Sequence, residues 1–304
     1  MKAAFIVNPA SANGSTGKRW PAIWERISAR GPEHSALLTA RPGHATDLAV
    51  GALTAGVDTV VAVGGDGTLS EVANGFFAGA ERYPNAALGL LPFGTGGDFR
   101  RTLGIPMDLD AAIESINVRR LRNIDVGRIE MQGLEGGTLV RHFINIADAG
   151  IGGVVVERVN RTSKLFGGKA SFMYASIATL LSYRPQEVAV KTEERSWSGR
   201  AQNVVVANGQ YFGGSMHVAP AAEPDDGQFE VVVFGDIARF EAIRSINDIY
   251  KADHLKNPKV TGWRSGRVEV TSPERVLIDV DGEMCGTLPA IFTVLPKALS
   301  VVIP

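Results

Sequence analysis

The sequence predicts an α/β protein made of two parts: an N-terminal doubly wound, mostly parallel sheet and a C-terminal antiparallel, β-rich domain. Up to Asp125, short apolar runs alternate with helix-length segments, which is the pattern of buried parallel strands joined by helices. Beyond Asp125, strand-like runs dominate, and several alternate apolar and polar residues as in sheets with one solvated face. This change of pattern places the main domain boundary near Asp125.

Strands and helices alternate in the first part. Its expected strands are Ala3–Val7, Ala36–Thr39, Thr59–Val63 and Ala87–Leu91, and its expected helices are Pro21–Arg30, Ala45–Ala55, Leu69–Gly79 and Asp108–Asn117. The expected strands of the second part are Val140–Ile146, Glu187–Thr192, Asn203–Ala207, Phe229–Phe234, Arg267–Thr271, Val276–Val280, Ile291–Leu295 and Ser300–Ile303. Helical spacing of apolar residues predicts two helices among them, Ala170–Tyr183 and Arg239–Tyr250.

Charge and cysteine content exclude several classes of protein. The chain has 304 residues and a formal charge of -1, so no overall positive field favours a nucleic-acid partner. Its single cysteine, Cys285, rules out an internal disulfide framework and is typical of a reducing cytosol. No stretch approaches the roughly 18 apolar residues that a transmembrane helix needs. We therefore expect a soluble, cytoplasmic protein that can still act at a membrane surface.

Three glycine-rich loops follow expected parallel strands: Asn8–Lys18 (NPASANGSTGK), Gly64–Thr68 (GGDGT) and Pro92–Phe99 (PFGTGGDF). Because ligands bind at the carboxyl ends of parallel strands, these loops indicate a phosphate site built from backbone N–H groups and helix N-termini. The common nucleotide fingerprints do not match. The P-loop spacing fails at Arg19, and no Gly-x-Gly-x-x-Gly or Gly-x-Ser-x-Gly pattern occurs at a strand end.

Carboxylates accompany three of the turns. Because a carboxylate repels phosphate, Asp66 either serves Mg²⁺ or a reacting hydroxyl, or it caps the helix that begins near Thr68; the local sequence favours neither role. Asp281–Glu283 ends an expected strand, and its Asp-Gly pair is also a hairpin-turn signal. Asp225–Gly227 is consistent with either a turn or an oxygen-rich metal loop.

Together, and in order along nearly the entire chain, these stretches resemble the diacylglycerol-kinase-type lipid kinases, in particular the soluble bacterial branch related to YegS. The wider superfamily includes sphingosine kinases and, more distantly, NAD kinases. The matching stretches are VNPASANGSTGK, TARPGHATDLA, GGDGTLSEVANG, LPFGTGGDFRRTLGIP, FINIADAGIGG, VANGQYFGGSMHVAPAAEPDDGQFEVVV and VDGEMCG. GGDGT alone leaves NAD kinases open, whereas GTGGDF, NGQYFGG and the late DGE favour the lipid-kinase branch.

The resemblance implies an NAD-kinase-like nucleotide-binding domain of residues 1–127 and 291–304, discontinuous because the C-terminal segment returns to it. Residues 128–290 would form a β-rich lipid-substrate domain. The implied activity is that of a Mg²⁺-dependent transferase of phospholipid biosynthesis, which moves the γ-phosphoryl group of ATP to a hydroxyl of diacylglycerol or a related lipid. A lipid substrate places the protein at a membrane surface, peripheral to the inner membrane face, and a homodimer is left open.

The resemblance also implies roles for individual residues. Carried over by motif, the general base is Glu283, with Asp66 and Asp281 near the metal and phosphates. The second-domain Mg²⁺ site maps onto the Asp226 side chain and the backbone carbonyls of Glu223 and Gln228. The ATP site maps onto Asn8, Pro9, Ser11, Lys18, Thr39, Gly64, Gly65, Asp66, Gly67, Thr68, Leu69, Ser70, Gly94 and Thr95.

One position departs from the family pattern: Gly97 stands where members commonly have Asn (GTGND), which removes a side-chain amide beside the expected nucleotide pocket. Two further functions stay open, a kinase of a soluble acceptor such as NAD and a nucleotide-binding protein that has lost catalysis. The basic clusters Arg100–Arg101 and Arg119–Arg122 are consistent with anionic headgroups or with solvated helix faces. Candidates to line a lipid site, although core packing explains each singly as well, are Leu165, Phe166, Phe172, Met173, Tyr174, Tyr211 and Phe212.

Overall fold

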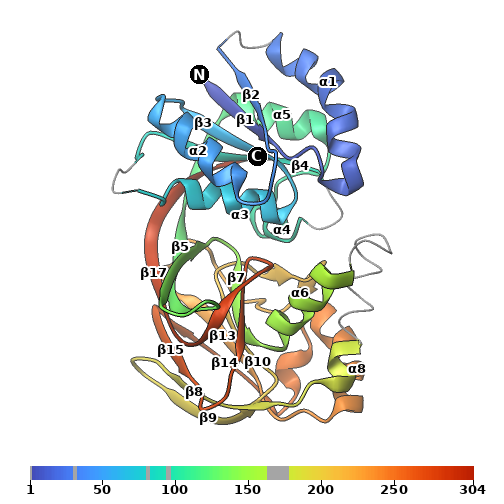
Figure 1. Cartoon of the computed structure of the whole chain (residues 1–304), viewed down its shortest axis with the longest axis vertical. Helices are drawn as coiled ribbons and strands as arrows, with labels where there is room; N and C mark the ends of the chain where they lie inside the picture. The colour runs from blue at the N-terminus through green and yellow to red at the C-terminus, as the bar shows by residue number, and fades with distance from the viewer. Residues whose placement is uncertain (1, 30–32, 80–82, 94–96, 163–177) are drawn as a thin grey trace. The chain divides into compact units, whose positions relative to one another are not determined.

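The computed structural model describes residues 2–29, 33–79, 83–93, 97–162 and 178–304. The chain forms two compact units, the first of Met1–Ile124 with Lys297–Pro304 and the second of Asp125–Pro296. Figure 1 labels the helices and strands of both.

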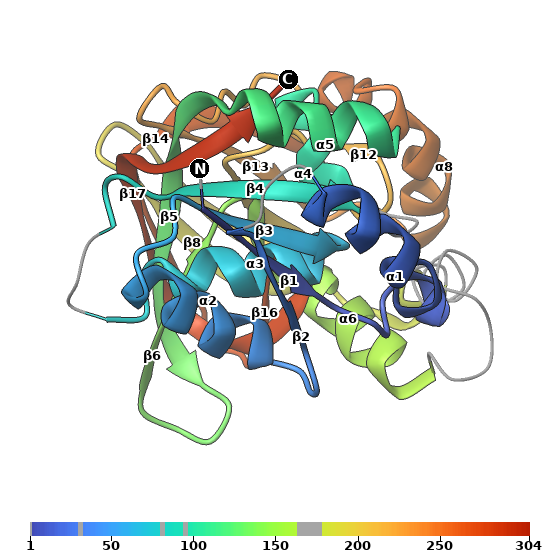
Figure 2. The same cartoon turned by 90° about the horizontal axis from the view of Figure 1, so that it is seen from above.

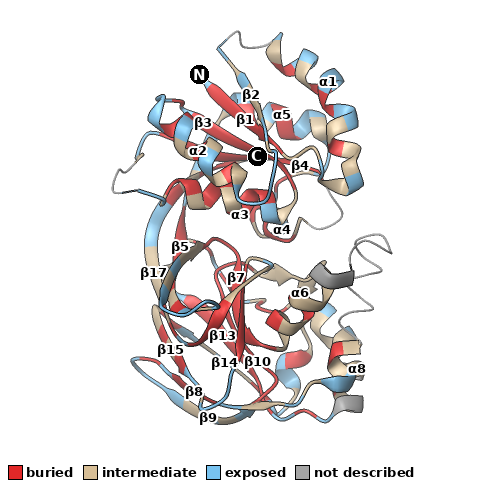
Figure 3. Cartoon of the chain, viewed as in Figure 1, coloured by how far each residue is buried: buried red, intermediate tan, exposed pale blue. Residues whose placement is uncertain are grey.

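A parallel sheet in the order β2-β1-β3-β4 forms the centre of the first unit. Its strands are β1 (Ala3–Val7), β2 (Ser35–Leu38), β3 (Thr59–Gly64) and β4 (Ala87–Pro92). The end of β17 (Glu283–Ile303) lies beside β4 as a fifth parallel strand, with Val301 opposite Leu88. β1 and β3 are buried along their whole length (Figure 3), which is why they read in the sequence as continuous apolar runs.

Helices cover both faces of this sheet. On one face, Trp20 and Ile23 of α1 (Ser15–Ser28) and Ile113 of α5 (Leu109–Val118) join Phe5 and Val61 in a single hydrophobic cluster. The helices α2 (His44–Thr54) and α3 (Asp66–Gly75) pack against each other and against β1 and β3. Figure 2 shows them on the opposite side of the sheet from α5. Two short helices, η1 (Ala12–Gly14) and α4 (Asp98–Leu103), follow the strands β1 and β4.

The second unit is built from antiparallel strands in the order β14-β13-β10-β7-β16-β17. β17 also pairs with β15 and β5, and β8, β9 and β6 extend these branches. The bounds are β5 (Arg120–Gly133), β6 (Thr138–Phe143), β7 (Ile146–Gly150), β8 (Gln186–Lys191), β9 (Ser196–Ala201), β10 (Asn203–Ala207), β13 (Phe229–Phe234), β14 (Val260–Ser265), β15 (Arg267–Thr271) and β16 (Leu277–Val280). A separate two-stranded sheet pairs β11 (Tyr211–Phe212) with β12 (Met216–His217).

Among its described residues, two hydrophobic clusters stabilise the second unit. The larger cluster lies between the strand layers, where the ring of Phe143 contacts those of Phe229 and Phe292 at centroid distances of 5.4 and 6.4 Å. The smaller one covers the other face of β10 and β13, where Val205 and Val232 pack with residues of the segment after β12 and of α8 (Arg239–Tyr250). A further helix, α6 (Ile151–Thr162), packs against β7 and β16, and η2 (His254–Lys256) precedes β14.

The predicted fold class is confirmed, but several element bounds differ from the prediction. α1 begins at Ser15 rather than Pro21, because Thr16 and Trp20 continue the buried stripe of the helix. The expected strand Val140–Ile146 is divided into β6 and β7, and the last two expected strands form the single strand β17. The strands β5, β9 and β14 were not predicted, because their exposed faces carry many charged or polar residues. Most of the expected helix Ala170–Tyr183 lies outside the described residues.

Candidate phosphate-binding edge and acidic hairpin

The predicted loops of the first unit follow strands that end at one edge of the parallel sheet. Asn8 follows β1, and its N–H donates to the penultimate carbonyl of β3 at 3.0 Å. Thr39 follows β2 and donates to the last carbonyl of β1 at 2.9 Å, while Phe93 follows β4 and donates to the last carbonyl of β3 at 2.8 Å. The sheet edge therefore aligns the residues that follow β1, β2 and β4, two of them on the end of β3.

This edge includes a topological switch point. From β1 the chain passes to β2 on one side and then to β3 on the other, so the crevice between β1 and β3 is the place where open α/β sheets bind ligands. The side chain of Asn8 spans these two strands, because its Nδ2 donates to the Thr68 hydroxyl at 3.0 Å. Two residues of the sequence-predicted ATP site are thus in direct contact at the switch point.

The first glycine-rich loop is folded on itself. The Ser11 hydroxyl donates to the Asn8 carbonyl at 2.9 Å and lies 2.6 Å from the Thr16 hydroxyl. The N–H of Gly17 donates to the carbonyl of Pro9, and a Cβ at Gly17 would lie 3.0 Å from that oxygen. Glycine is therefore required where helix α1 passes the loop. Lys18, the next residue of α1, is exposed.

The three glycines of GGDGT have different surroundings. A Cβ at Gly64 would lie 2.5 Å from the Thr68 hydroxyl, so only glycine lets this side chain turn back onto the strand end. Gly65 has ordinary spacing, and a Cβ at Gly67 would meet nothing within 4 Å. The exposed backbone of Gly67 is accordingly the part of the loop that a ligand can approach. Leu69 and Ser70 are buried within α3, and the predicted residues Gly94 and Thr95 lie outside the described residues.

Asp66 caps a helix other than its own. It is the first residue of α3, whose N-terminal cap is Gly65, a residue with no side chain to cap the helix. The Asp66 carboxylate instead accepts hydrogen bonds from the N–H groups of Gly97 (2.7 Å), Asp98 (3.0 Å) and Phe99 (3.4 Å), at the start of α4. Both of its oxygens are bonded to main-chain donors, which is the arrangement of a structural cap rather than of an open metal ligand.

Gly97 has a left-handed backbone conformation. Its φ of 78° and ψ of 47° lie in the left-handed region, which Gly and Asn adopt most readily. The change from the family Asn to Gly therefore preserves the backbone turn and the N–H bond to Asp66, while it removes the amide side chain.

In the second unit, the late DGE motif forms a tight hairpin. Asp281 (φ 50°) and Gly282 (φ 89°) connect β16 to β17, so the Asp-Gly hairpin signal in the sequence is correct. The Asp281 carboxylate accepts hydrogen bonds from three consecutive N–H groups, those of Ile144, Asn145 and Ile146, at 3.0–3.1 Å. These bonds occupy the break between β6 and β7 and explain why the expected continuous strand is divided there.

Glu283 is the first residue after this hairpin and pairs with an arginine. The Arg141 guanidinium on β6 donates to Glu283 Oε2 at 2.7 Å, and the Glu283 side chain is 39% exposed. The Arg141 guanidinium therefore holds the Glu283 carboxylate in place, and this carboxylate stays partly exposed. Nearby, burial raises the pKa of the Cys285 thiol to about 12, so Cys285 stays protonated and non-nucleophilic near neutral pH.

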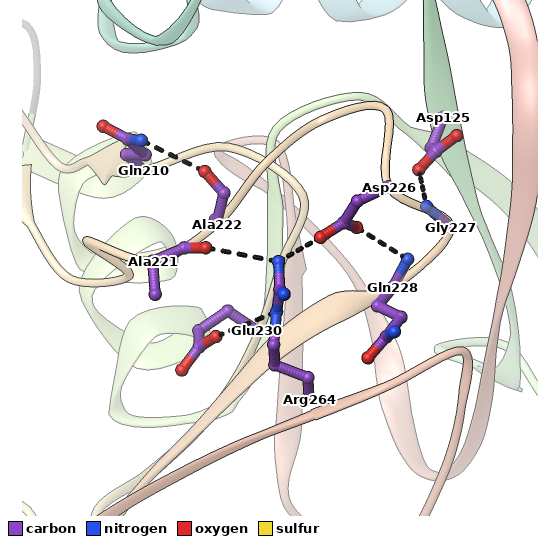
Figure 4. A network of polar contacts seen from close by, with 9 residues as sticks. All are labelled: Asp125, Gln210, Ala221, Ala222, Asp226, Gly227, Gln228, Glu230 and Arg264. Carbon is purple, nitrogen blue, oxygen red and sulfur yellow. Dashed lines mark hydrogen bonds and ion pairs between the residues drawn. The ribbon is translucent and has the colours of Figure 1, made fainter.

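The Asp226 loop does not present the open oxygens that a Mg²⁺ site needs. Asp226 Oδ1 accepts the N–H of Gln228 at 2.9 Å, and Oδ2 pairs with the Arg264 guanidinium (Figure 4). Glu223 and Gln228, the expected carbonyl ligands, are exposed residues of the same loop. A guanidinium already neutralises the carboxylate that would hold the ion, so these residues do not fit a divalent cation there. Within the described residues, no group of three or more His, Cys, Asp or Glu side chains is placed to hold a metal.

Two other groups of predicted residues have structural contacts. Arg119 donates to the Thr59 hydroxyl and to the carbonyls of Asp58 and Asn85, so it fastens the end of α5 to the sheet. Tyr211 stacks on His217 across the β11–β12 pair, with ring centroids 4.3 Å apart. The other aromatic and apolar candidates, Leu165, Phe166, Phe172, Met173 and Tyr174, lie outside the described residues.

Sequence reasoning missed Arg141, Arg264 and a buried acidic pair. Asp148 on β7 and Asp279 on β16 face each other across the two strands, and both are buried. Burial raises the pKa of Asp148 to about 7 and that of Asp279 well above its ordinary value. The sequence does contain a pattern that indicates buried aspartates, since each of the two interrupts an otherwise apolar strand (IADAG and LIDV).

Comparisons with known proteins match both units. The family described as "Diacylglycerol kinase catalytic domain" matches residues 2–129, and the "YegS C-terminal NAD kinase beta sandwich-like domain" matches residues 145–303. A Bacillus subtilis protein named diacylglycerol kinase is 30% identical over 304 residues, covering 100% of this chain and 96% of the relative. The chain belongs to the diacylglycerol kinase family. A diacylglycerol kinase of Staphylococcus haemolyticus is 29% identical and covers 99% of this chain and 88% of its own length.

Solved structures show the same fold. A diacylglycerol kinase structure from Bacillus anthracis aligns with a TM-score of 0.74 at 22% identity, covering 100% of this chain and 97% of the other. A yeast NADH kinase structure aligns with a TM-score of 0.56 at 12% identity, covering 100% and 84%. The NAD-kinase-like fold expected for the chain is thus confirmed. Among the described residues, no helix is both long and apolar enough to cross a membrane.

Proposed function

We propose that this member of a kinase family transfers the γ-phosphoryl group of ATP to a hydroxyl of diacylglycerol or a related lipid. The observation that carries the proposal is the alignment of the glycine-rich loops at the β1/β3 switch point, where Asn8 and Thr68 are hydrogen-bonded. Phosphoryl transfer depends mainly on positioning and on stabilisation of charge, which backbone N–H groups at such an edge supply. The family membership and the names of the relatives support the lipid acceptor.

The first unit would bind the nucleotide. In this proposal the accessible backbone at Gly67 and the N-terminus of α3 approach the phosphates, and the Asn8–Thr68 contact fixes the two loops around them. Asp66 serves as a positioning residue, because its bonds to residues 97–99 hold the third loop at the same edge. ATP brings Mg²⁺ as the ion that accompanies its phosphates. The nucleotide-binding domain would comprise residues 1–127 with 291–304.

The second unit would act on the acceptor. Glu283 is the proposed general base, which takes the proton of the attacking hydroxyl while Arg141 holds the carboxylate in place. Asp281 positions Glu283, because its three main-chain bonds fix the hairpin from which Glu283 projects. General-base assistance of about 10²–10⁴-fold lowers the barrier by roughly 3–5 kcal/mol. The lipid domain would comprise residues 128–290 and act at the cytoplasmic face of a membrane.

The test is the identity of the phosphorylated product. The protein is incubated with γ-labelled ATP and a mixed lipid extract, and in parallel with NAD, and the label is followed into the organic and aqueous phases. Label in a chloroform-soluble phosphate monoester that depends on Glu283 supports the proposal. Label only in the dinucleotide would replace the lipid acceptor by a soluble one, and ATP binding without turnover on either acceptor would indicate a protein that has lost catalysis.

A further inference from the structure

The guanidinium of Arg264 lies among three oxygen acceptors in the second unit (Figure 4). It pairs with Asp226 Oδ2, its Nε lies 3.8 Å from Glu230 Oε2, and its Nη2 lies 3.5 Å from the carbonyl oxygen of Ala221. Two carboxylates and a carbonyl are a set of ligands typical of a hard divalent cation. Here a side chain of the protein itself contacts all three.

Sheet register places Arg264 in this position. Arg264 on β14 lies directly opposite Glu230 on β13, so the two side chains project from the same face of the sheet. Two residues before Arg264 on β14 is Gly262, where an added Cβ would lie only 3.3 Å from Glu230 Oε1. Glu230 is 6% exposed, and the nearest cationic atom to its Oε2 in this cluster is Arg264 Nε, at 3.8 Å. The arginine is therefore the charge that compensates a buried carboxylate.

Hydrogen bonds of the protein itself close the loop around Asp226. Gly227 donates to the Asp125 carboxylate at 2.6 Å, and the N–H of Asp125 donates back to the carbonyl of Pro224 at 2.6 Å. The N–H of Gln228 donates to Asp226 Oδ1 at 2.9 Å. The loop thus has its backbone conformation fixed on both sides of Asp226, which leaves the charge of Asp226 to be balanced by Arg264.

We propose that Arg264 is the resident cation of this loop and excludes a divalent ion from the position where the family resemblance implies Mg²⁺. Arginine stays protonated at every physiological pH, and its planar donors match carboxylate oxygens. A dication bound to the same Asp226 oxygen would sit within a few ångströms of the guanidinium, where like charges repel strongly. The loop accordingly folds without metal, and the Asp226 site does not contribute to any Mg²⁺ requirement of the protein.

The experiment compares Mn²⁺ binding, as a paramagnetic probe for a divalent-ion site, in four nucleotide-free forms of the full chain. These are the wild type, Asp226→Asn, Arg264→Ala and the double variant. The wild type and Asp226→Asn are expected to bind Mn²⁺ equally. Arg264→Ala is expected to gain about one ion per chain, because two carboxylates and a carbonyl become available, and the double variant is expected to lose that gain.

Two outcomes would overturn the proposal: a wild-type Mn²⁺ site that Asp226→Asn removes, or an Arg264→Ala variant that folds and gains no ion. Arg267→Ala is the matched control, because Arg267 is about as exposed as Arg264 and pairs with Glu269 two residues along its own strand, β15; this variant should bind Mn²⁺ as the wild type does. Arg264→Gln keeps most of the side-chain volume in case the alanine variant is unstable.

The wild type gives an independent measurement. Its thermal unfolding midpoint should be the same in chelator and in millimolar Mg²⁺, and an Asp226-dependent rise with Mg²⁺ would contradict the proposal. None of these readouts depends on the proposed reaction.

Discussion

The glycine-rich edge of the first unit and the acidic hairpin of the second each contain an aspartate bonded to three consecutive N–H groups. Asp66 binds the N–H groups of residues 97–99, and Asp281 binds those of residues 144–146. In both places the carboxylate joins two segments that are far apart in the sequence. The aspartates of the GGDGT and DGE motifs thus each fix the backbone of a second, distant segment.

The two regions differ in what accompanies the aspartate. Beside Asp66 lie the accessible backbone of Gly67 and a hydroxyl, that of Thr68. Beside Asp281 lies a second carboxylate, Glu283, which is partly exposed and paired with Arg141. Neutral donors suit phosphate, and a carboxylate suits a proton, so the proposed roles of these two motifs differ although both contain Asp-Gly. The following predictions test this division.

The largest effect is expected at Glu283. Glu283→Gln should lower kcat by about 100-fold or more, because the amide cannot accept the hydroxyl proton. Its effect on stability should be below about 1 kcal/mol, since the lost ion pair is partly exposed. Steady-state kinetics with lipid and ATP, together with denaturant unfolding, measures both. Near-normal turnover in this variant would remove Glu283 from the mechanism.

Asp281→Asn should lower stability more than Glu283→Gln does, and lower kcat less. The amide retains one acceptor oxygen but loses the charge that three N–H groups share, which should destabilise the hairpin by about 1–3 kcal/mol. Amide exchange at residues 144–146 should accelerate. If Asp281→Asn leaves that exchange unchanged and still lowers kcat about as much as Glu283→Gln, then Asp281 acts on the reactants and the comparison with Asp66 fails.

Asp66→Ala should destabilise the first unit by about 2 kcal/mol, through loss of a helix cap and of bonds to part-buried donors. Amide exchange at residues 97–99 should accelerate, and ATP should bind more weakly because the third loop is no longer fixed. Asp47→Asn is the matched control, since Asp47 pairs with Arg41 at an exposed position and should change stability by less than about 0.5 kcal/mol. Unchanged exchange at residues 97–99 in the Asp66 variant would refute the capping role.

The buried pair Asp148–Asp279 predicts a pH dependence that neither motif aspartate explains. Burial raises the pKa of Asp148 from 3.8 to about 7, so between these values the folded chain keeps a proton that the unfolded chain has released. Stability should therefore fall as pH rises from about 4 to about 7, by up to about 1.4 kcal/mol per pH unit for each titrating group. Denaturant unfolding at several pH values should show this slope, and Asp148→Asn should reduce it. An identical slope in the variant would contradict the shifted pKa.

The sequence predicted the first unit more completely than the second, for a physical reason. Strands buried on both faces, such as Thr59–Gly64, read as unbroken apolar runs, and the glycines after them mark the sheet edge directly. In the second unit, β5 alternates buried and charged residues only in its second half, and β14 is buried only at Val260 and Ser265, so their patterns resemble those of exposed loops. The motif residues could be named from the sequence in both units.

The partners of those residues could not be predicted. Asp66 bonds to residues about thirty positions away, Glu283 pairs with Arg141 across 142 positions, and Asp226 with Arg264 across 38. Each contact depends on sheet register and helix placement, and neither leaves a local pattern in the chain. A single sequence therefore indicates which carboxylates matter, whereas the structure shows which are occupied by backbone donors and which by arginine.

The smallest effect concerns Gly97, the position that departs from the family. Gly97→Asn should leave stability within about 0.5 kcal/mol of the wild type, because Asn tolerates the left-handed backbone, whereas Gly97→Ala should cost roughly 1–2 kcal/mol. A Cβ here would also lie 2.8 Å from Arg100 Nε, a flexible side chain that must move aside. Gly56→Ala and Gly56→Asn separate backbone strain from the contact with Arg100, since Gly56 has φ 72° with nothing within 4 Å of its Cβ position.

Titration of each Gly97 variant with ATP then isolates the effect of the side chain on nucleotide affinity. Equal affinity for Asn and Gly shows that only the backbone turn matters at this edge, and a tenfold gain with Asn shows that the amide itself contacts the nucleotide.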